Sequence, residues 1–154
     1  MQISPLQLNT FWIGKVVIEP AAQPLIHPDV QITVETTPVY RRNDADPRNW
    51  IVDLRVAFRS ADDRKVAYEG SVEMTGIFKI ISDFSEKKQM EMIAVNSPSI
   101  LYSSIREFVS MVTAHGPHGK LVLPSVSFID QKLLPLNKES HSVQPESKAE
   151  PASR

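Results

Sequence analysis

Residues 97–116 read SPSILYSSIREFVSMVTAHG, and this stretch decides the fold. Its apolar side chains recur at helical spacing, which predicts a long helix. Ser97 suits the N-cap and Pro98 the first helical position, and Gly116 followed by Pro117 closes the helix. Further apolar residues lie on the side opposite to the main apolar stripe. The helix is therefore apolar around more of its surface than one sheet face requires, which indicates assembly.

Four stretches upstream have the alternation or the residue types of β-strands. They are Leu6–Glu19, Val30–Val39, Trp50–Phe58 and Lys65–Ile80. The polar link Ser60–Arg64 predicts a hairpin between the third and the fourth strand. Gly70 and Gly76 lie inside the fourth strand and predict bulges or bends there.

Two further segments complete the predicted fold. Gln89–Val95 is expected to add a short helical piece before the main helix, and Ser125–Leu134 to form a second, shorter helix. We expect an α+β fold, a four-stranded antiparallel sheet followed by two helices packed on one face. Residues 1–134 then form one domain. Residues 135–154 are polar and rich in Ser, Glu, Lys and Pro, which predicts a disordered tail.

Composition excludes several classes of protein. The net charge of −1 over 154 residues gives no bias toward nucleic acid or an anionic membrane surface. The absence of cysteine rules out disulfides, a thiol nucleophile and thiolate metal sites. No signal peptide begins the sequence, and no apolar run is long enough to span a membrane. We expect a cytoplasmic protein that binds neither nucleic acid nor a membrane.

Few residues are candidates for chemistry. His115 and His118 lie close together in the sequence, yet two histidines without a third ligand at a familiar spacing more often face water than hold a metal. Asp44 and Asp46 are typical of a turn. The sequence has neither a serine elbow nor a glycine-rich phosphate loop. We expect no enzyme, no cofactor and no metal; a small-ligand-binding or metal-dependent α+β domain using His115 and His118 is a distant alternative.

The proline-rich segment after the first strand and the predicted second helix have two interpretations. They either complete the core, or they border a groove, floored by the second strand, that takes extended apolar peptides. Periodicity alone favours the core.

Several motifs in the second half of the chain resemble the SecB export-chaperone family. The resemblance extends over approximately residues 11–134 and is most specific from residue 76 to residue 128. The motifs are a strand ending in Gly76-Ile77-Phe78, the helix start Ser97-Pro98-Ser99-Ile100-Leu101-Tyr102, the helix core Ile105-Arg106-Glu107-Phe108, the closing Gly116, and the link Lys120-Leu121-Val122-Leu123-Pro124-Ser125-Val126-Ser127-Phe128.

This resemblance implies a homotetramer, built as a dimer of dimers through the long helices. It also implies an ATP-independent holdase that binds unfolded or non-native polypeptides in apolar grooves for protein export. The client-binding groove would comprise Ile26, Val30, Ile32, Val34, Leu121, Leu123, Val126 and Phe128. The oligomer interface would comprise Leu101, Tyr102, Ile105, Val109 and Val112.

The family delivers unfolded preproteins to the SecA motor through acidic residues on the exposed sheet face and through its tail. The matching positions here are Lys15, Glu19, Glu69 and Ser71, so the acidic pattern is only partly present. SecB-like chaperones also protect the antitoxin of toxin–antitoxin systems, and this is the alternative function. The resemblance names the client class without choosing between a preprotein and an antitoxin.

Overall fold

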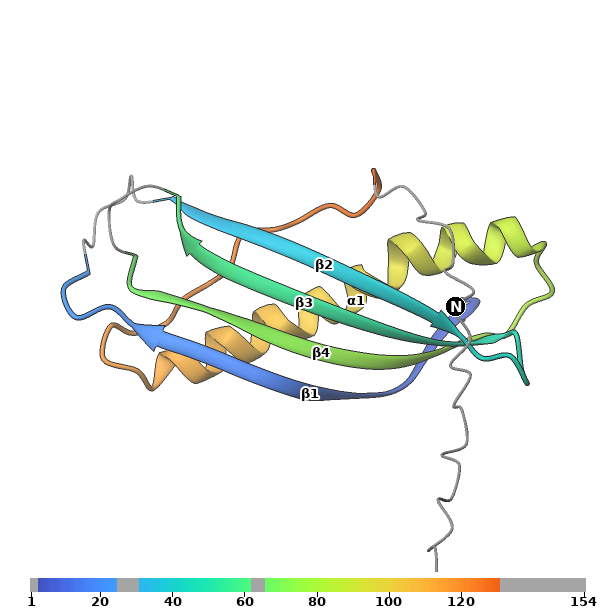
Figure 1. Ribbon diagram of the computed structural model, residues 1–154, viewed down its shortest axis with the longest axis horizontal. Coiled ribbons are helices and arrows are strands. Elements are labelled where there is room, and N and C mark those ends of the chain that lie inside the picture. Colours follow the sequence, from blue (N-terminus) through green and yellow to red (C-terminus); the bar gives the residue numbers. More distant parts are fainter. Residues whose placement is uncertain (1–2, 25–30, 62–65, 131–154) are drawn as a thin grey trace, which may run out of the picture.

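The fold is one antiparallel sheet with one long helix on one of its faces (Figure 1). The computed structural model describes residues 3–24, 31–61 and 66–130. The elements are β1 (Leu6–Pro20), β2 (Ile32–Arg42), β3 (Asn49–Ser60), β4 (Tyr68–Ile80) and α1 (Glu86–Ala114). The predicted α+β class and the four antiparallel strands are confirmed.

The strand order is β1-β4-β3-β2, so β3 and β4 are central and β1 and β2 form the edges. β3 and β4 pair as antiparallel neighbours, as the predicted hairpin requires, although its turn at residues 62–65 lies outside the described residues. The predicted tail, residues 135–154, also lies outside them. α1 packs mainly on the two central strands.

Alternation along the central strands builds the core. Every second residue of β3 is at most 2% exposed: Trp50, Val52, Leu54, Val56 and Phe58. Val72, Met74 and Phe78 stand beside them on β4 and are equally buried. α1 covers this layer. Removal of these side chains from water contributes about 25 cal/mol per Å² of apolar surface, which holds helix and sheet together.

The sheet irregularities lie on β1, not on β4 as the glycines predicted. The β1–β4 register shifts between Leu8 and Thr10 and again between Ile13 and Lys15, whereas β3 and β4 pair without interruption. Gly70 has a different role, because a Cβ atom there would lie 1.9 Å from the carbonyl oxygen of Val17. Its lack of a side chain lets β1 approach β4.

The helix begins at Glu86, so the predicted start at Ser97 is wrong. Ser85 is the N-cap, and its hydroxyl accepts a hydrogen bond from the backbone N of Lys88 at 3.4 Å. The segment Gln89–Val95 is helical as predicted, but it belongs to the same helix. Ser97 and Pro98 form a plausible cap when only neighbouring residues are considered. In the structure both lie buried inside α1.

A tyrosine from β2 explains how the helix continues through the proline. Pro98 has no N–H, so the carbonyl of Ala94, four residues earlier, loses its helical donor. The hydroxyl of Tyr40 donates a hydrogen bond to this carbonyl at 3.0 Å. The hydroxyl of Ser97 donates to the carbonyl of Ile93. The cost of a proline inside a helix is thus partly offset by a residue from the edge strand.

The predicted second helix is also wrong for the described residues, because the chain is extended after α1. Figure 1 shows this segment crossing behind the sheet and continuing past β2. We call residues 120–128 the strap. The inward residues Leu121 and Leu123 are two apart and separated by the exposed Val122, which is the period of an extended chain. Residues 131–134 of the predicted helix lie outside the described part.

The Gly70→Ala variant is expected to lose about 2 kcal/mol or more of unfolding free energy, because its methyl group would collide with the β1 backbone. Urea denaturation would measure the loss. Gly14→Ala is the matched control, since the nearest atom to a Cβ there is 3.9 Å away. Equal stability of the two variants would contradict the role of Gly70.

The Tyr40→Phe variant is expected to be about 1–2 kcal/mol less stable at pH 7, because the Ala94 carbonyl loses its donor. Burial raises the pKa of Tyr40 to about 12. The unfolded chain releases this proton first, so the wild type loses stability as the pH rises from about 10 toward 12. The variant should lose less over that range.

Urea denaturation across a pH series measures both effects. Val39→Ala removes an exposed side chain of the same strand and serves as the control. A Tyr40→Phe variant as stable as this control would refute the account of Pro98.

Candidate functional site

The strap is attached to α1 mainly through its backbone. The guanidinium Nε of Arg106 donates to the carbonyl of Leu123 at 2.6 Å. The hydroxyl of Tyr102 donates to the carbonyl of Pro124 at 2.5 Å. The backbone N of Leu121 donates to the hydroxyl of Thr113 at 2.8 Å. Side chains of α1 thus bind main-chain groups, which every peptide possesses.

Two strap side chains enter the core. Leu123 is 0% and Phe128 1% exposed, and the rings of Phe128 and Tyr102 meet edge-to-face with centroids 6.0 Å apart. Burial raises the pKa of the Tyr102 hydroxyl, and the positive charge of Arg106 partly opposes this. The hydroxyl therefore stays protonated at neutral pH and remains a donor to the strap.

The structure brings some of the predicted groove residues to one side of the sheet. Ile32 and Val34 lie partly buried on the helix-covered face of the edge strand β2. Leu121 and Val126 are partly buried against the same core. These four side chains retain accessible surface. Leu123 and Phe128 fill the core instead of bordering a groove, and Ile26 and Val30 lie outside the described residues.

A shallow pocket of about 230 Å³ separates the strap from the outer side of α1. Five of its six lining residues are polar or charged: Ser103, Arg106, Glu107, Ser110 and Lys120, with Val122 as the sixth. The strap therefore contacts α1 closely along its inward residues and less closely along its outward edge.

Four of the five residues expected at an oligomer interface are buried within the single chain. Leu101, Tyr102, Ile105 and Val109 are 0–4% exposed. They have almost no surface left for a partner, so this expectation needs correction. Val112 is the exception, at 38% exposed.

Other exposed apolar residues were missed as candidates for an interface. Phe11 and Val16 lie on the helix side of β1, opposite Gly76 and Val72 of β4, and are 49% and 40% exposed. Met111 of α1 is 58% exposed. The sequence already indicated this exposed surface, because β1 has apolar residues on both of its faces. One helix cannot cover both faces of an edge strand.

The outer sheet face carries the positions expected to contact a motor. Glu19 stands opposite Glu69, and Lys15 stands opposite Glu73, on the paired strands β1 and β4. Arg55 lies 3.6 Å from Glu73 across the β3–β4 pair. Among the described residues of this face, one acidic pair, Glu19 and Glu69, is thus accompanied by a site of mixed charge around Glu73.

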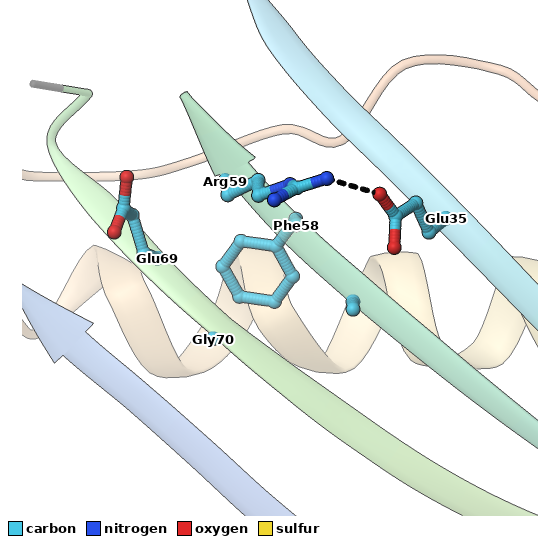
Figure 2. Close-up of a pocket in the computed structure, with 6 residues that line it drawn as sticks. Glu35, Phe58, Arg59, Glu69 and Gly70 are labelled. Atoms are coloured by element: carbon cyan, nitrogen blue, oxygen red, sulfur yellow. Dashed lines mark hydrogen bonds and ion pairs between the residues drawn. The ribbon is translucent and has the colours of Figure 1, made fainter. Parts of the chain in front are cut away.

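A pocket of about 270 Å³ opens on this face between β2 and β4. Figure 2 shows Arg59 reaching toward Glu35, at 2.5 Å, while Glu69 stands apart on β4. Glu69 accepts a hydrogen bond from the backbone N of Ser60 at 3.1 Å. Each charged side chain that is described in this pocket therefore has a hydrogen-bond partner already: Arg59 pairs with Glu35, and Glu69 accepts from a backbone N–H.

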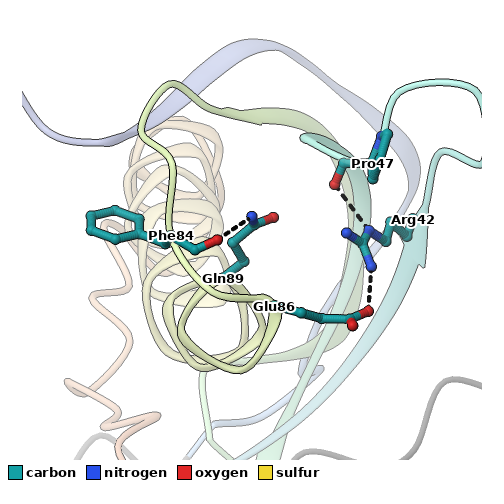
Figure 3. A network of polar contacts seen from close by, with 5 residues as sticks. All are labelled: Arg42, Pro47, Phe84, Glu86 and Gln89. Carbon is teal, nitrogen blue, oxygen red and sulfur yellow. Dashed lines mark hydrogen bonds and ion pairs between the residues drawn. The ribbon is translucent and has the colours of Figure 1, made fainter.

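A polar cluster attaches the start of α1 to β2. Arg42 forms an ion pair with Glu86 at 2.5 Å and donates to the carbonyl of Pro47 at 2.9 Å (Figure 3). Its guanidinium lies 5.5 Å from the centre of the Trp50 ring. Gln89 donates to the carbonyl of Phe84 at 2.8 Å. This cluster fixes the position of the helix and offers no reactive group.

The two histidines considered for a metal site have separate surroundings. The Nε2 atom of His118 donates to the carbonyl of Ala21 at 2.7 Å, and its backbone N donates to the hydroxyl of Tyr68 at 3.0 Å. His115 is exposed at the end of α1. Within residues 3–24, 31–61 and 66–130, no three His, Asp or Glu side chains come together as metal ligands. His118 thus anchors the loop that leads into the strap.

Fold and site together define the class: an α+β domain whose long helix carries an extended segment of its own chain, without a metal-ligand cluster among the described residues. The family model described as preprotein translocase subunit SecB matches residues 2–132. The chain belongs to the SecB family, a family of chaperones. None of the helices in the described part is long and apolar enough to cross a membrane.

Two kinds of known protein are similar to this chain. The protein-export protein SecB of Acinetobacter baumannii is 28% identical over 83 residues, which is 54% of each chain. The match therefore spans about half the length of the curated relatives. The Rv1957 SecB-like chaperone of Mycobacterium tuberculosis, solved in complex with a ChAD peptide from the Rv1956 HigA1 antitoxin, has the same fold. Its TM-score is 0.63 at 17% identity, and the superposition covers 79% of this chain and 91% of that one.

Proposed function

We propose that this protein is an ATP-independent holdase that binds extended apolar segments of non-native polypeptides. The observation that carries the proposal is the strap itself. α1 already holds an extended segment through backbone hydrogen bonds from Arg106 and Tyr102 and through two buried apolar side chains. Recognition of this kind depends little on sequence, because it uses main-chain groups and apolar burial.

The relatives support protein export as the main role and antitoxin protection as the alternative. The Acinetobacter baumannii relatives are named for protein export. The Mycobacterium tuberculosis structure contains a peptide from an antitoxin. In both roles the client is an extended, aggregation-prone segment captured in the cytoplasm, without nucleotide or metal. A toxin–antitoxin gene pair adjacent to this gene would favour the alternative.

We further propose that the protein assembles as a homotetramer, a dimer of dimers. Support comes from apolar side chains that the described chain leaves exposed on the helix side: Phe11, Val16, Met111 and Val112. Such surface is unusual on a monomer in water. An assembly would bury it and place several client sites on one particle.

Delivery to the SecA motor would use the outer face of the sheet. The outer sheet face carries Glu19 and Glu69 side by side, but Lys15 and Arg55 both stand beside Glu73, four residues further along β4. A basic partner would therefore meet mixed charge. Direct binding of purified motor to this protein, measured against a Glu19→Lys and Glu69→Lys double variant, tests this role.

The holdase activity itself is tested with a reduced, unfolding client monitored by light scattering. We expect aggregation to be suppressed without ATP. Unchanged aggregation at a severalfold molar excess of this protein would refute the proposed function.

Replacing Ile32 and Val34 together with Asp is expected to weaken client capture about tenfold or more. These side chains are the accessible apolar part of β2 on the helix side, and a carboxylate there opposes the burial of apolar client residues. Client affinity by fluorescence anisotropy provides the measurement.

Thr33→Asp with Thr37→Asp places the same two charges on the opposite face of β2 and is the control. Circular dichroism must show both proteins to be folded. Equal capture by the folded double variant and the control would disprove the groove assignment.

The Val112→Asp variant is expected to lower the particle mass at micromolar concentration, because a charge would enter the proposed subunit contact. Light scattering coupled to size-exclusion chromatography measures the mass. Ser103→Asp adds the same charge to another exposed position of α1. A monomeric wild type, or a variant with the mass of the wild type, would contradict the assembly proposal.

A further inference from the structure

We propose that the strap is an internal competitor of the clients and occupies the client site of α1 until a client displaces it. This inference rests on the proposed function and adds a preference: client segments carry a large aliphatic residue followed, five positions later, by an aromatic one. Leu123 and Phe128 of the strap have this spacing. In the client-free protein the strap would lie on α1, and in the client-bound protein a segment of the client would lie there instead.

The polar contacts of the strap run to its main chain, as those of a bound peptide do, while Leu123 and Phe128 belong to the core. Among the described residues, the hydrogen bonds that hold it run to side chains of α1 and none runs to a strand. Arg106 and Tyr102 bind two consecutive carbonyls, Leu123 and Pro124, which fixes direction and register. Any peptide running the same way presents the same two acceptors.

The side chains of the strap divide into two sets. Leu123 and Phe128 enter the core and are at most 1% exposed, whereas Val122 and the next residue after the strap, Ile129, are 53% and 75% exposed. Only the buried positions of such a segment constrain which residue types can bind, because the other side chains face water. Because the edge-to-face contact with Tyr102 needs a ring, an aromatic residue is favoured at the position of Phe128.

The chain around the strap allows it to leave without disturbing the sheet. The preceding turn ends at Gly119, which has φ of 76° and open space where a Cβ would lie. Before that turn, His118 is held by Tyr68 and Ala21. In the part of the chain that the structure describes, all sheet pairing lies between residues 6 and 80. Detachment of residues 120–128 therefore breaks no strand pairing, and it uncovers the core around Leu123 and Phe128.

The test uses a fluorescent peptide with the sequence of residues 119–129 as the client probe, and the full chain as the binder. Leu123→Ala with Phe128→Ala empties both pockets, so the probe should bind this variant about tenfold more tightly than the wild type. Val122→Ala with Ile129→Ala removes an exposed apolar side chain of the strap and the one that directly follows it, and should leave affinity unchanged. A probe with Asp in place of Leu123 and Phe128 should not bind.

Hydrogen exchange on the wild type gives a second measurement that needs no destabilised variant. Saturation with the probe should reduce protection of the Leu121 amide, which donates to Thr113 in the free protein. Phe128→Leu is a milder change that serves if the double variant does not fold. It should raise the affinity for the probe about threefold.

Equal probe affinity for wild type and folded strap variants, or unchanged strap protection in the bound state, would overturn the proposal. Holdase assays on the same proteins separate the two claims. If the wild type suppresses aggregation, but neither the probe affinity of the strap variants nor the protection of the strap changes, only the strap inference is refuted. A wild type that suppresses no aggregation refutes the proposed function, whatever the probe does.

Discussion

The hydrogen bond from Tyr40 to the carbonyl of Ala94 links the edge strand to the middle of the only helix described. Without a donor at this point, Pro98 would favour two shorter helices, because it removes a helical hydrogen bond and its ring disturbs the preceding turn. One continuous helix spans the sheet, and its second half carries Tyr102, Arg106 and Thr113 in line for the strap. The site thus depends on a contact made far from it.

The strands were predictable because alternation is a local property that burial of one sheet face enforces. The helix start was not, since Ser97 and Pro98 form a good cap in isolation and their compensation comes from Tyr40, which is remote in sequence. The strap was missed for a related reason. Its backbone is held by side chains of α1, and apolar residues at 126, 128 and 129 fit a short helix as well as an extended chain.

The excess of apolar residues around the helix pointed to assembly, and this interpretation was wrong for most of them. α1 lies between two covers, the sheet on one side and the strap on another. Tyr102 faces the strap through its ring and hydroxyl, while Leu101 and Ile105 belong to the core beneath the helix. A helix that is apolar around most of its surface is therefore packed on two sides. The second packing surface comes either from a partner subunit or from the same chain.

A site that contains part of its own chain exchanges one extended segment for another when it binds. The net free energy is the difference between two similar sets of contacts, so each site binds weakly even though each segment buries considerable apolar surface. Under the proposed function, weak exchange would allow the protein to release its clients without ATP. Affinity for a long unfolded chain then comes from several sites engaged at once. Assembly through the exposed apolar surface of β1 and α1 would bring several such sites, each with its own strap, onto one particle.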